Sequence, residues 1–225
     1  MLIDEVFQNL GGQFLTSAQE MTVKLQSINA FVFDWDGVFN DGVKAHEKGS
    51  PFSEPDSMGL NMLRFSYWLK NGKLPFVSII TGENNLFALD FAKREHLHAV
   101  YLKAKNKQDV INQFATKHEL TSQQIAFVFD DILDLNAAKI CQLAICVRRG
   151  ASPLFQDFIR EENLCDYISA YQGGQHAIRE ITELLIGLNG NYKETVSKRM
   201  QYGDAYLQYL QERNAVEVHF EKIVS

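Results

Sequence analysis

This 225-residue chain has only three cysteines, no excess of positive charge and no long apolar run. Cys141, Cys146 and Cys165 are too few and too unevenly spaced for a disulfide framework or a zinc site, so we expect buried free thiols in a reducing cytoplasm. The 22 basic and 28 acidic residues give a net charge of −6, which argues against a nucleic-acid partner. No run approaches the roughly 20 apolar residues of a membrane span, and residues 1–10 carry acids where a signal peptide is basic. We therefore expect a cytoplasmic protein with no nucleic-acid and no membrane partner.

The composition is that of a folded globular chain, with 46% hydrophobic and 22% charged residues. Between residues 28 and 190, short apolar runs of strand character alternate with helical patterns, without internal repeats. This alternation predicts an α/β fold, a doubly wound parallel sheet with helices on both faces. The expected strands span residues 30–33, 74–81, 99–102, 125–129, 143–147 and 167–169.

Both ends of the chain are predicted to be helical extensions of this domain. Residues 1–27 suit one or two short helices, interrupted by Gly11 and Gly12, that pack on the domain or on another subunit. Within residues 191–225, a helical pattern over 192–213 precedes an alternation over 216–220 that is typical of a strand. The aromatic stripe of this helical pattern favours a packing surface at a subunit contact.

The first predicted strand ends in two carboxylates, Asp34 and Asp36, followed by Gly37. Ligands of open α/β sheets bind at the carboxyl ends of the strands. Because side chains alternate along a strand, Asp34 and Asp36 leave it on the same side and Trp35 points the other way. Two carboxylates this close repel each other unless a cation or a proton lies between them. A solvated polar strand end is the plainer alternative.

A hydroxyl and a glycine, Thr81 and Gly82, end the second predicted strand. A hydroxyl at a strand end, beside the amino terminus of a helix, can bind phosphate oxygens. Capping of the helix expected over residues 83–96 is the alternative. The position of Thr81 beside the strand of Asp34 favours a phosphate site.

Lysines at positions 103, 105 and 107 lie ahead of the next predicted helix. Positive charge near a helix start is unfavourable to the helix dipole, which suggests that one of these lysines serves a ligand. Ordinary surface lysines are the alternative.

The fourth predicted strand ends in Asp130 and Asp131, with Asp134 three residues further on. Three carboxylates in five residues, at the edge that carries Asp34, favour a bound cation. Magnesium prefers carboxylate and water oxygens and often uses only one or two protein carboxylates. Helix capping accounts for one or two of these residues but not for the whole cluster.

The order of these motifs resembles that of the haloacid dehalogenase superfamily, whose first motif is Asp-x-Asp-Gly. Six segments between residues 30 and 188 also follow the order found in its 3-deoxy-D-manno-octulosonate-8-phosphate phosphatase family. They are Asp34-x-Asp-Gly-Val-x-x-Asp-Gly42, Asp56-Ser-Met-Gly59, Ile80-Thr-Gly82, Asn106-Lys107, Asp130-Asp-x-x-Asp134 and Gly173-Gly-x-x-Ala-x-Arg-Glu180. The last segment is the more family-specific part of the match.

This resemblance implies a phosphomonoesterase. Asp34 would attack phosphorus and form an aspartyl phosphate, and Asp36 would serve as the general acid and base. Thr81, Gly82 and Lys107 would hold the phosphate. The lysine at position 105 is the rival of Lys107 for this role.

The resemblance also implies a magnesium site. Asp34, the main-chain carbonyl of Asp36 and Asp130 would bind Mg²⁺, with Asp131 as a direct or water-mediated ligand. Asp134 would orient the phosphate-binding lysine or cap the helix that follows.

Family members have a β-hairpin in place of a cap domain, and neighbouring subunits of their tetramers wall the active site. We therefore expect a small hairpin flap within residues 41–55, no large cap domain, and a homo-oligomer, by resemblance a tetramer. Arg179 would bind the carboxylate of a sugar acid.

Two departures from the family pattern concern the site itself. Glu83 stands where the octulosonate enzymes usually have arginine, and in this respect the chain looks more like the phosphatases of nine-carbon sialic-type acids. Phe129 replaces a glycine ahead of the acidic pair.

The leading hypothesis is a magnesium-dependent phosphomonoesterase acting on a small sugar-acid phosphate. Two alternatives stay open. One is a broad-specificity phosphatase of sugar phosphates or nucleotides, and the other is a non-catalytic oligomeric regulator that binds a phosphorylated ligand.

Overall fold

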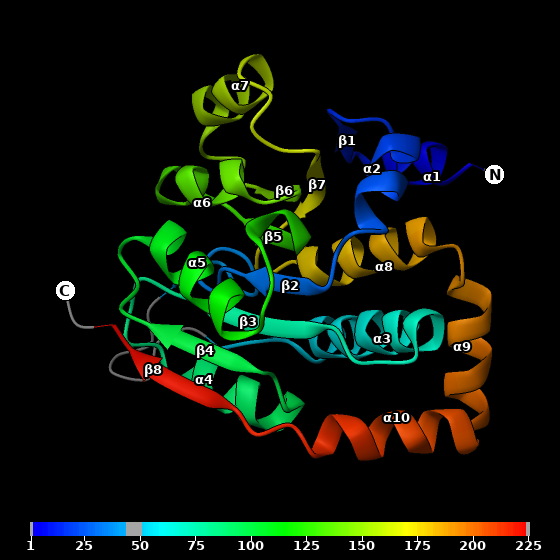
Figure 1. Cartoon of the computed structure of the whole chain (residues 1–225). Coiled ribbons are helices and arrows are strands. Elements are labelled where there is room, and N and C mark those ends of the chain that lie inside the picture. Colours follow the sequence, from blue (N-terminus) through cyan, green and yellow to red (C-terminus); the bar gives the residue numbers. More distant parts are fainter. Residues whose placement is uncertain (1, 44–50, 224–225) are drawn as a thin grey trace.

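The computed structural model describes residues 2–43 and 51–223. Within them, eight strands form one sheet (Figure 1). Their bounds are β1 Gln13–Phe14, β2 Ala30–Phe33, β3 Phe76–Ile80, β4 Ala99–Leu102, β5 Ile125–Phe129, β6 Leu143–Arg148, β7 Tyr167–Gln172 and β8 His219–Lys222. The order across the sheet is β1-β7-β6-β5-β2-β3-β4-β8, and all neighbours are parallel except β1 and β7. The predicted parallel α/β sheet is confirmed.

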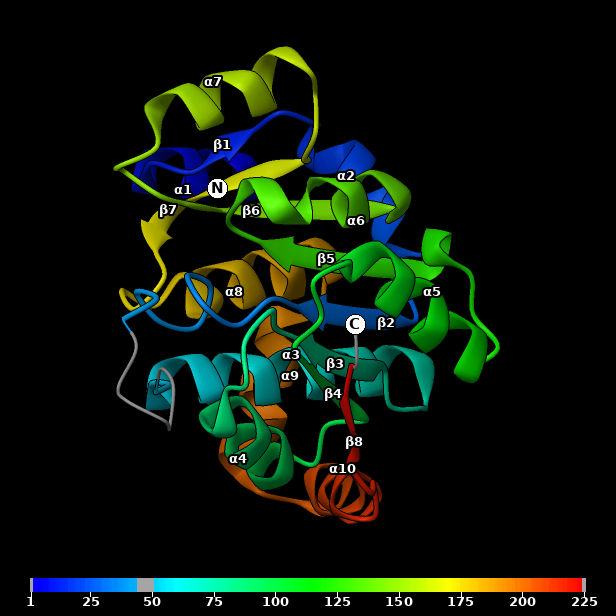
Figure 2. The same cartoon turned by 90° about the vertical axis from the view of Figure 1, so that its left-hand side faces the viewer.

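Helices cover both faces of this sheet (Figures 1 and 2). Their bounds are α1 Ile3–Leu10, α2 Ala18–Leu25, α3 Glu54–Asn71, α4 Leu86–Glu95, α5 Lys107–Lys117, α6 Leu135–Ile140, α7 Pro153–Glu161, α8 Ala177–Asn189, α9 Tyr192–Gln201 and α10 Asp204–Asn214, with 3₁₀ turns at Ser122–Gln124 and Ile132–Asp134. One apolar core joins α1, α2, α3, α4 and α8 to one face, and a second core joins α5, α6 and α7 to the other. The sheet is therefore doubly wound, as predicted.

The side-chain alternation of β2 sets these two layers. Phe31 and Phe33 enter the first core, whereas Ala30 and Val32 enter the second. Trp35 continues the first set and is fully buried, stacked on Phe39 at 4.8 Å between ring centroids. Asp34 and Asp36 consequently leave the strand on the side away from this ring, as the alternation predicts.

Strand pairing explains where the observed bounds differ from the expected ones. The second strand starts at Phe76 rather than at residue 74, because Phe76 is the residue paired with Ala30 at the start of β2. The last two strands of the domain are longer than expected, since Arg148 of β6 pairs with Gln172 of β7.

The terminal segments each add helices and one edge strand to the sheet. Two short helices, α1 and α2, flank β1, and Gly11 ends α1 in the left-handed region at φ +111°. At the other end, β8 runs beside β4 (Figure 1). It starts at His219, later than the alternation over 216–220 predicts, because its pairing with β4 begins opposite Ala99.

The aromatic stripe near the carboxyl terminus packs within the chain. Tyr206 and Tyr209 of α10 are buried against Phe65 and Trp68 of α3. The expectation that this stripe serves a subunit contact is thus wrong for these two tyrosines, because α3 supplies the aromatic surface that covers them.

The strands β2, β3, β5 and β6 end at one edge of the sheet. The loop after β2, in blue, lies there beside the amino-terminal end of α8 (Figure 2). Residues 44–50 of the predicted hairpin flap lie outside the described residues. No further domain is inserted among the residues that the structure does describe.

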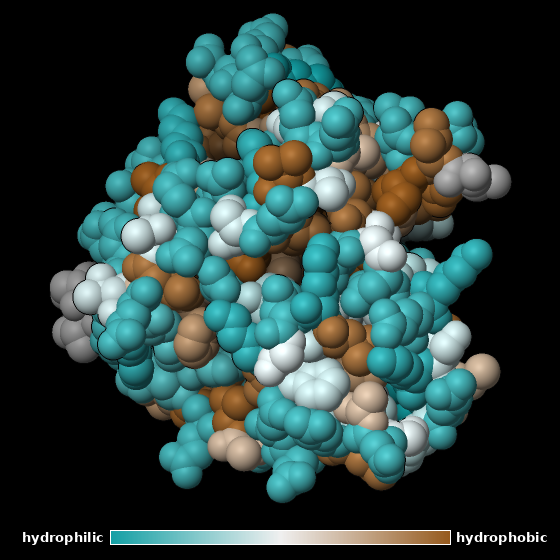
Figure 3. Space-filling view, turned by 45° about the vertical axis from the view of Figure 1, so that its right-hand side comes forward, coloured by the Kyte–Doolittle hydropathy of each residue, from teal (hydrophilic) through white to brown (hydrophobic). Residues whose placement is uncertain are grey.

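None of the described helices is both long and apolar enough to cross a membrane. Apolar side chains do gather on the surface at α1, where Leu2, Val6 and Leu10 are 65%, 41% and 44% exposed (Figure 3). Phe7, on the inward side of this helix, joins the core. Helix α1 therefore has an apolar face toward the domain and a second apolar surface exposed.

Candidate active site

A cleft of about 560 Å³ opens at the carboxyl edge of the sheet. Most of the residues predicted from the sequence line it, namely Asp34, Asp36, Gly82, Lys107, Asp130, Asp131 and Asp134. Thr81, also predicted, lies buried at the same edge, hydrogen-bonded to Asp36. The sequence motifs that follow different strands thus meet in one cleft.

Lys107 joins two acidic segments on the floor of this cleft. It is the first residue of α5, is 7% exposed, and its Nζ lies 2.7 Å from Oδ1 of Asp34. The same Nζ contacts Oδ1 of Asp134. Burial alone would lower the pKa of Lys107, but the charges of Asp34 and Asp134 outweigh this effect and raise that pKa. Lys107 therefore carries its positive charge next to both carboxylates.

Three buried carboxylates crowd together beside this lysine. Asp34, Asp130 and Asp134 bring oxygen atoms within 4.8 Å of one another and are 4%, 2% and 1% exposed. Burial, together with repulsion from Asp34, raises the pKa of Asp130 to about 8 and that of Asp134 to about 7. Hard oxygen donors in such a cluster suit a divalent cation.

Asp131 lies at the rim of the same cluster. Its Oδ1 accepts a hydrogen bond of 2.7 Å from the main-chain N–H of Ile132, so this oxygen caps the 3₁₀ turn that follows β5. Asp131 is not part of the acidic cluster. Its third member is Asp134, which the sequence suggested as a residue that orients the phosphate-binding lysine.

Both oxygens of Asp36 accept hydrogen bonds from the segment after β3. Oγ1 of Thr81 donates to Oδ2 of Asp36 at 3.2 Å, and Nδ2 of Asn85 donates to Oδ1 at 3.1 Å. Asn85, rather than Thr81, caps α4 through a bond from the N–H of Ala88. This cap also explains why α4 starts at Leu86 instead of residue 83. Asn85 was not predicted, because nothing in its local sequence marks a contact with Asp36.

The loop after β2 is fixed by close backbone packing. Gly37 adopts φ +87°, and a Cβ at this position would lie 2.1 Å from atoms of Arg149 and Asp130. Oδ1 of Asn40 accepts hydrogen bonds from the N–H groups of Gly37 and Gly42 at 3.4 and 2.9 Å. A Cβ at Gly173 would lie 2.1 Å from the carbonyl oxygen of Gly37. The glycines of the first and last motifs thus let these two loops approach each other.

Arg149 is a second residue that the sequence did not indicate. It follows β6 directly, lines the cleft, and its Nη2 contacts Oδ2 of Asp130. Its side chain is 36% exposed, so part of the guanidinium faces the cleft. Its place immediately after a strand was the one signal that could have identified it.

Arg179 is not among the residues that line the cleft. Its Nε and Nη2 donate to Oε1 of Glu183 at 2.9 and 2.7 Å. Its neighbour Glu180 is buried and accepts hydrogen bonds from Tyr167 and from the N–H groups of residues 170 and 171. The family-specific segment thus anchors the end of β7 in this chain.

Phe129 points away from the acidic cluster. Its ring is fully buried in the second core and stacks on Phe127 at 5.8 Å between centroids. The side chain that replaces a glycine therefore lies in the helix-covered layer and does not fill the cleft.

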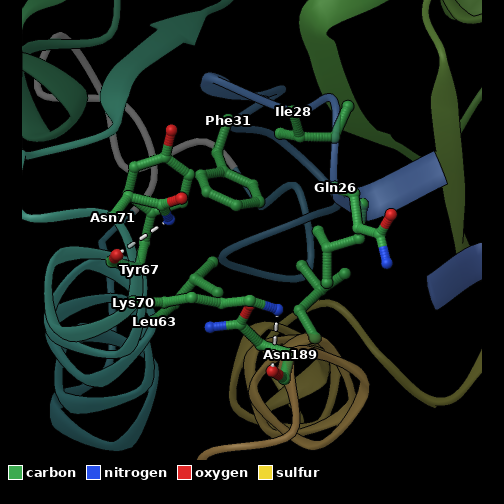
Figure 4. A pocket seen from close by; sticks show the side chains of 10 residues that line it. Gln26, Ile28, Phe31, Leu63, Tyr67, Lys70, Asn71 and Asn189 are labelled. Carbon is green, nitrogen blue, oxygen red and sulfur yellow. Dashed lines mark hydrogen bonds between the residues drawn. The ribbon is translucent and has the colours of Figure 1, made fainter. Parts of the chain in front are cut away.

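A second, smaller pocket lies at the opposite end of β2, between α3 and α8 (Figure 4). Its volume is about 80 Å³, and Phe31, Leu63 and Leu185 are among its lining residues. Lys70 there donates to the carbonyl oxygen of Asn189 at 3.0 Å. With this small volume and no carboxylate in its lining, the pocket does not rival the cleft as a site for chemistry.

No family model matches the chain. The chain is similar to the 3-deoxy-D-manno-octulosonate 8-phosphate phosphatase of Escherichia coli, with 25% identity over 179 residues that cover 78% of this chain and 88% of the relative. It is also similar to the phosphatase of the same name from Salmonella typhi, with 26% identity, 76% of this chain and 86% of the relative covered.

Solved structures show the same likeness. A probable YrbI family phosphatase from Pseudomonas syringae matches with a TM-score of 0.67 and 26% identity, covering 81% of this chain and 98% of that one. The 3-deoxy-D-manno-octulosonate 8-phosphate phosphatase from Moraxella catarrhalis, solved with a magnesium ion, a phosphate ion and KDO, matches in fold with a TM-score of 0.66 and 24% identity, covering 80% and 98%.

Proposed function

The chain is a phosphatase of the haloacid dehalogenase superfamily, of the type of its 3-deoxy-D-manno-octulosonate-8-phosphate phosphatase family, and on that premise we propose its substrate and mechanism. It hydrolyses the phosphomonoester of a small sugar acid, with magnesium, through an aspartyl phosphate on Asp34. The observation that carries this proposal is the contact of Lys107 Nζ with Asp34 Oδ1 at 2.7 Å, inside the cleft.

The residues present fit a magnesium ion. Asp34, Asp130 and Asp134 offer buried oxygen atoms within 4.8 Å of one another, and hard oxygen donors of this kind suit a divalent cation. Asp34 and Asp130 would hold the ion, together with the main-chain carbonyl of Asp36, while Asp134 stays with Lys107. Bound magnesium would neutralise charge on the phosphate oxygens and on the attacking carboxylate.

The first chemical step follows from the hydrogen bonds of Asp34 and Asp36. Lys107 holds Oδ1 of Asp34, which leaves the other oxygen to attack phosphorus in line with the leaving alcohol. A bond from Asp34 to phosphorus forms as the ester bond breaks. Asp36 donates a proton to the departing alkoxide, so that an alcohol leaves.

The second step returns the enzyme to its starting state. Asp36, now a carboxylate, takes a proton from water, and the water oxygen attacks phosphorus as the bond to Asp34 breaks. Inorganic phosphate leaves, and the proton stays on Asp36 for the next turnover. Thr81, which donates to Asp36, and Lys107, which contacts Asp34, hold the phosphate oxygens.

A sugar acid fits the charge of the cleft. Lys105, Lys107 and Arg149 line it together with six carboxylates, so these cations would hold a phosphate and a second anionic group once bound magnesium offsets part of the negative charge. Glu83 also lines the cleft. Because the chain resembles the phosphatases of nine-carbon acids at this position, a nine-carbon keto-acid phosphate is the alternative to the eight-carbon substrate.

Phosphate release from a panel of phosphomonoesters tests the proposed substrate. The panel holds 3-deoxy-octulosonate 8-phosphate, a nine-carbon keto-acid phosphate, a hexose phosphate and a nucleotide, each with and without magnesium. We expect magnesium-dependent turnover with a preference for one keto-acid phosphate. Equal low rates on all four would favour a broad-specificity phosphatase, and binding without any turnover would favour a regulator.

Assembly into a homotetramer is part of the proposal, and so is the division into a domain over 28–190 with extensions over 1–27 and 191–225. The exposed apolar side chains of Leu2, Val6 and Leu10 support a contact between copies. Light scattering on the wild type and on a Val6→Glu variant tests this: a tetramer that dissociates in the variant supports the contact, and a monomeric wild type contradicts it.

A further inference from the structure

Asn85 has two hydrogen-bonding ends with different partners. Its Oδ1 accepts a hydrogen bond of 3.4 Å from the N–H of Ala88, which makes it the cap of α4. Its Nδ2 donates to Oδ1 of Asp36 at 3.1 Å. The residue is 1% exposed, so both ends are used inside the protein.

These two contacts fix the orientation of the amide. Oxygen and nitrogen of an Asn side chain can be exchanged by a half-turn, and the hydrogen-bond network decides between the two orientations. Here the main-chain N–H of Ala88 can bond only to the amide oxygen. The amide nitrogen must therefore face Asp36, where an oxygen would repel the carboxylate.

Helix α4 holds Asn85 rigidly in place. Ala88, Phe91 and Ala92 are fully buried in the first core. Phe91 contacts Trp35 at 5.5 Å between ring centroids, and Trp35 precedes Asp36 in the chain. The cap residue and the carboxylate that it contacts are thus supported by the same packed cluster.

We propose that Asn85 is the positioning residue of Asp36. This inference rests on the proposed role of Asp36 as general acid and base. A carboxyl group that gives a proton to the leaving alcohol and later takes one from water must keep its geometry in both protonation states. The amide of Asn85 does not titrate and donates to Oδ1 in either state, whereas Thr81 is shared with the phosphate site.

Two substitutions separate this role from helix capping. Asn85→Ser keeps a cap oxygen but is too short to donate to Asp36, and Asn85→Asp keeps the cap oxygen and places a negative charge where the donor was. Ser17→Ala is the control, because it removes a cap hydrogen bond from α2, remote from the cleft. The readouts are thermal unfolding, kcat and KM across pH, and phosphate release without magnesium.

We expect Asn85→Ser to unfold near the wild-type temperature and Asn85→Asp at a lower one, because its carboxylate is buried beside Asp36. Both should lose about 10- to 100-fold in kcat, with KM nearly unchanged, a part of the 10²- to 10⁴-fold that a positioned acid or base contributes. The whole kcat profile moves to higher pH, further in Asn85→Asp than in Asn85→Ser, because a lost donor favours the protonated form of Asp36, which is the acid of the first step and has to ionise for the second. Ser17→Ala lowers the unfolding temperature and leaves the profile unchanged.

Folded Asn85 variants with wild-type kcat and an unmoved pH profile would overturn the inference. That result is distinct from failure of the proposed function, which would show as wild-type turnover that survives Asp34→Asn. Loss of activity that comes only with a lowered unfolding temperature, and with an unmoved profile, would assign Asn85 to capping alone and also overturn the inference.

Discussion

Lys107 Nζ lies 2.7 Å from Oδ1 of Asp34, although the helices α3 and α4 and the strands β3 and β4 lie between the two residues in the chain. Lys107 opens α5 and Asp34 follows β2, so the contact joins the two elements at the edge where the strands end. Because Asp134 binds the same Nζ, one buried cation serves two carboxylates. The predictions about the site follow from this arrangement.

Asp34→Asn should abolish turnover. The amide has nearly the same shape as the carboxylate but is a poor nucleophile, and the bond with Lys107 loses its charge. We expect at least a 10³-fold loss of kcat, with thermal unfolding little changed. Phosphate release under magnesium measures it, and more than a few percent of wild-type activity would contradict the role of Asp34.

Lys107→Met should harm both stability and activity. It leaves Asp34 and Asp134 buried without their cation, which typically costs about 3–5 kcal/mol in the free energy of unfolding. Activity should fall about 10²- to 10³-fold, as for loss of one transition-state donor. In the double variant with Asp134→Asn, one uncompensated carboxylate is gone. Urea unfolding should then show stability partly restored while phosphate release stays low, and recovery of both would argue against a role for Lys107 in the chemistry.

Magnesium should stabilise the wild type against heat, since it relieves repulsion among Asp34, Asp130 and Asp134. Asp130→Asn removes one of the proposed ligands and one of the repelling charges. This variant should therefore unfold at or above the wild-type temperature without metal and gain little when magnesium is added. Thermal shift over a magnesium series measures both effects, and equal shifts in the two proteins would contradict the assignment of Asp130.

Acid should destabilise the protein through His98. Burial, and less so the charges of Arg64 and His118, lowers the pKa of His98 from 6.5 to about 3, and its Nδ1 accepts a hydrogen bond from the N–H of Val77 at 3.1 Å. Between these two pKa values the unfolded chain binds a proton that the folded chain does not. Stability is therefore present above pH 6.5 and is lost as pH falls, by up to about 1.4 kcal/mol per pH unit.

A His98→Asn variant isolates this effect. Asparagine can offer an acceptor to Val77 but does not titrate. Urea unfolding from pH 7.5 to 4.5 should show a smaller loss of stability in the variant than in the wild type, and parallel curves would assign the acid sensitivity to other groups.

Much of the candidate site could be predicted because it follows strand ends. Asp34, Thr81 and Asp130 each come directly after an apolar run, and parallel strands bring such positions to one edge. Lys107 was found through its place at a helix start together with the family resemblance. Chain order and side-chain chemistry were sufficient to bring Asp34, Thr81 and Asp130 to one edge, whereas the choice of Lys107 also needed the resemblance.

Asn85 could not be predicted, and only its place after a strand marked Arg149, because the roles of both residues depend on contacts between distant segments. Asn85 reaches Asp36 across 49 positions, and Arg149 reaches Asp130 across 19. The edge strand β1 is similar: two residues form it only because Gln13 and Phe14 pair with β7. Hydrophobic periodicity carries no signal for such pairings.

The measurement that tests the central claim most directly is acid quenching during turnover with 3-deoxy-octulosonate 8-phosphate and magnesium, followed by mass spectrometry of the peptides. The account predicts a phosphoryl group on the peptide that contains Asp34, formed at the rate of substrate cleavage and absent in Asp34→Asn. A phosphoryl group on another residue, or turnover by Asp34→Asn at the wild-type rate, would contradict it.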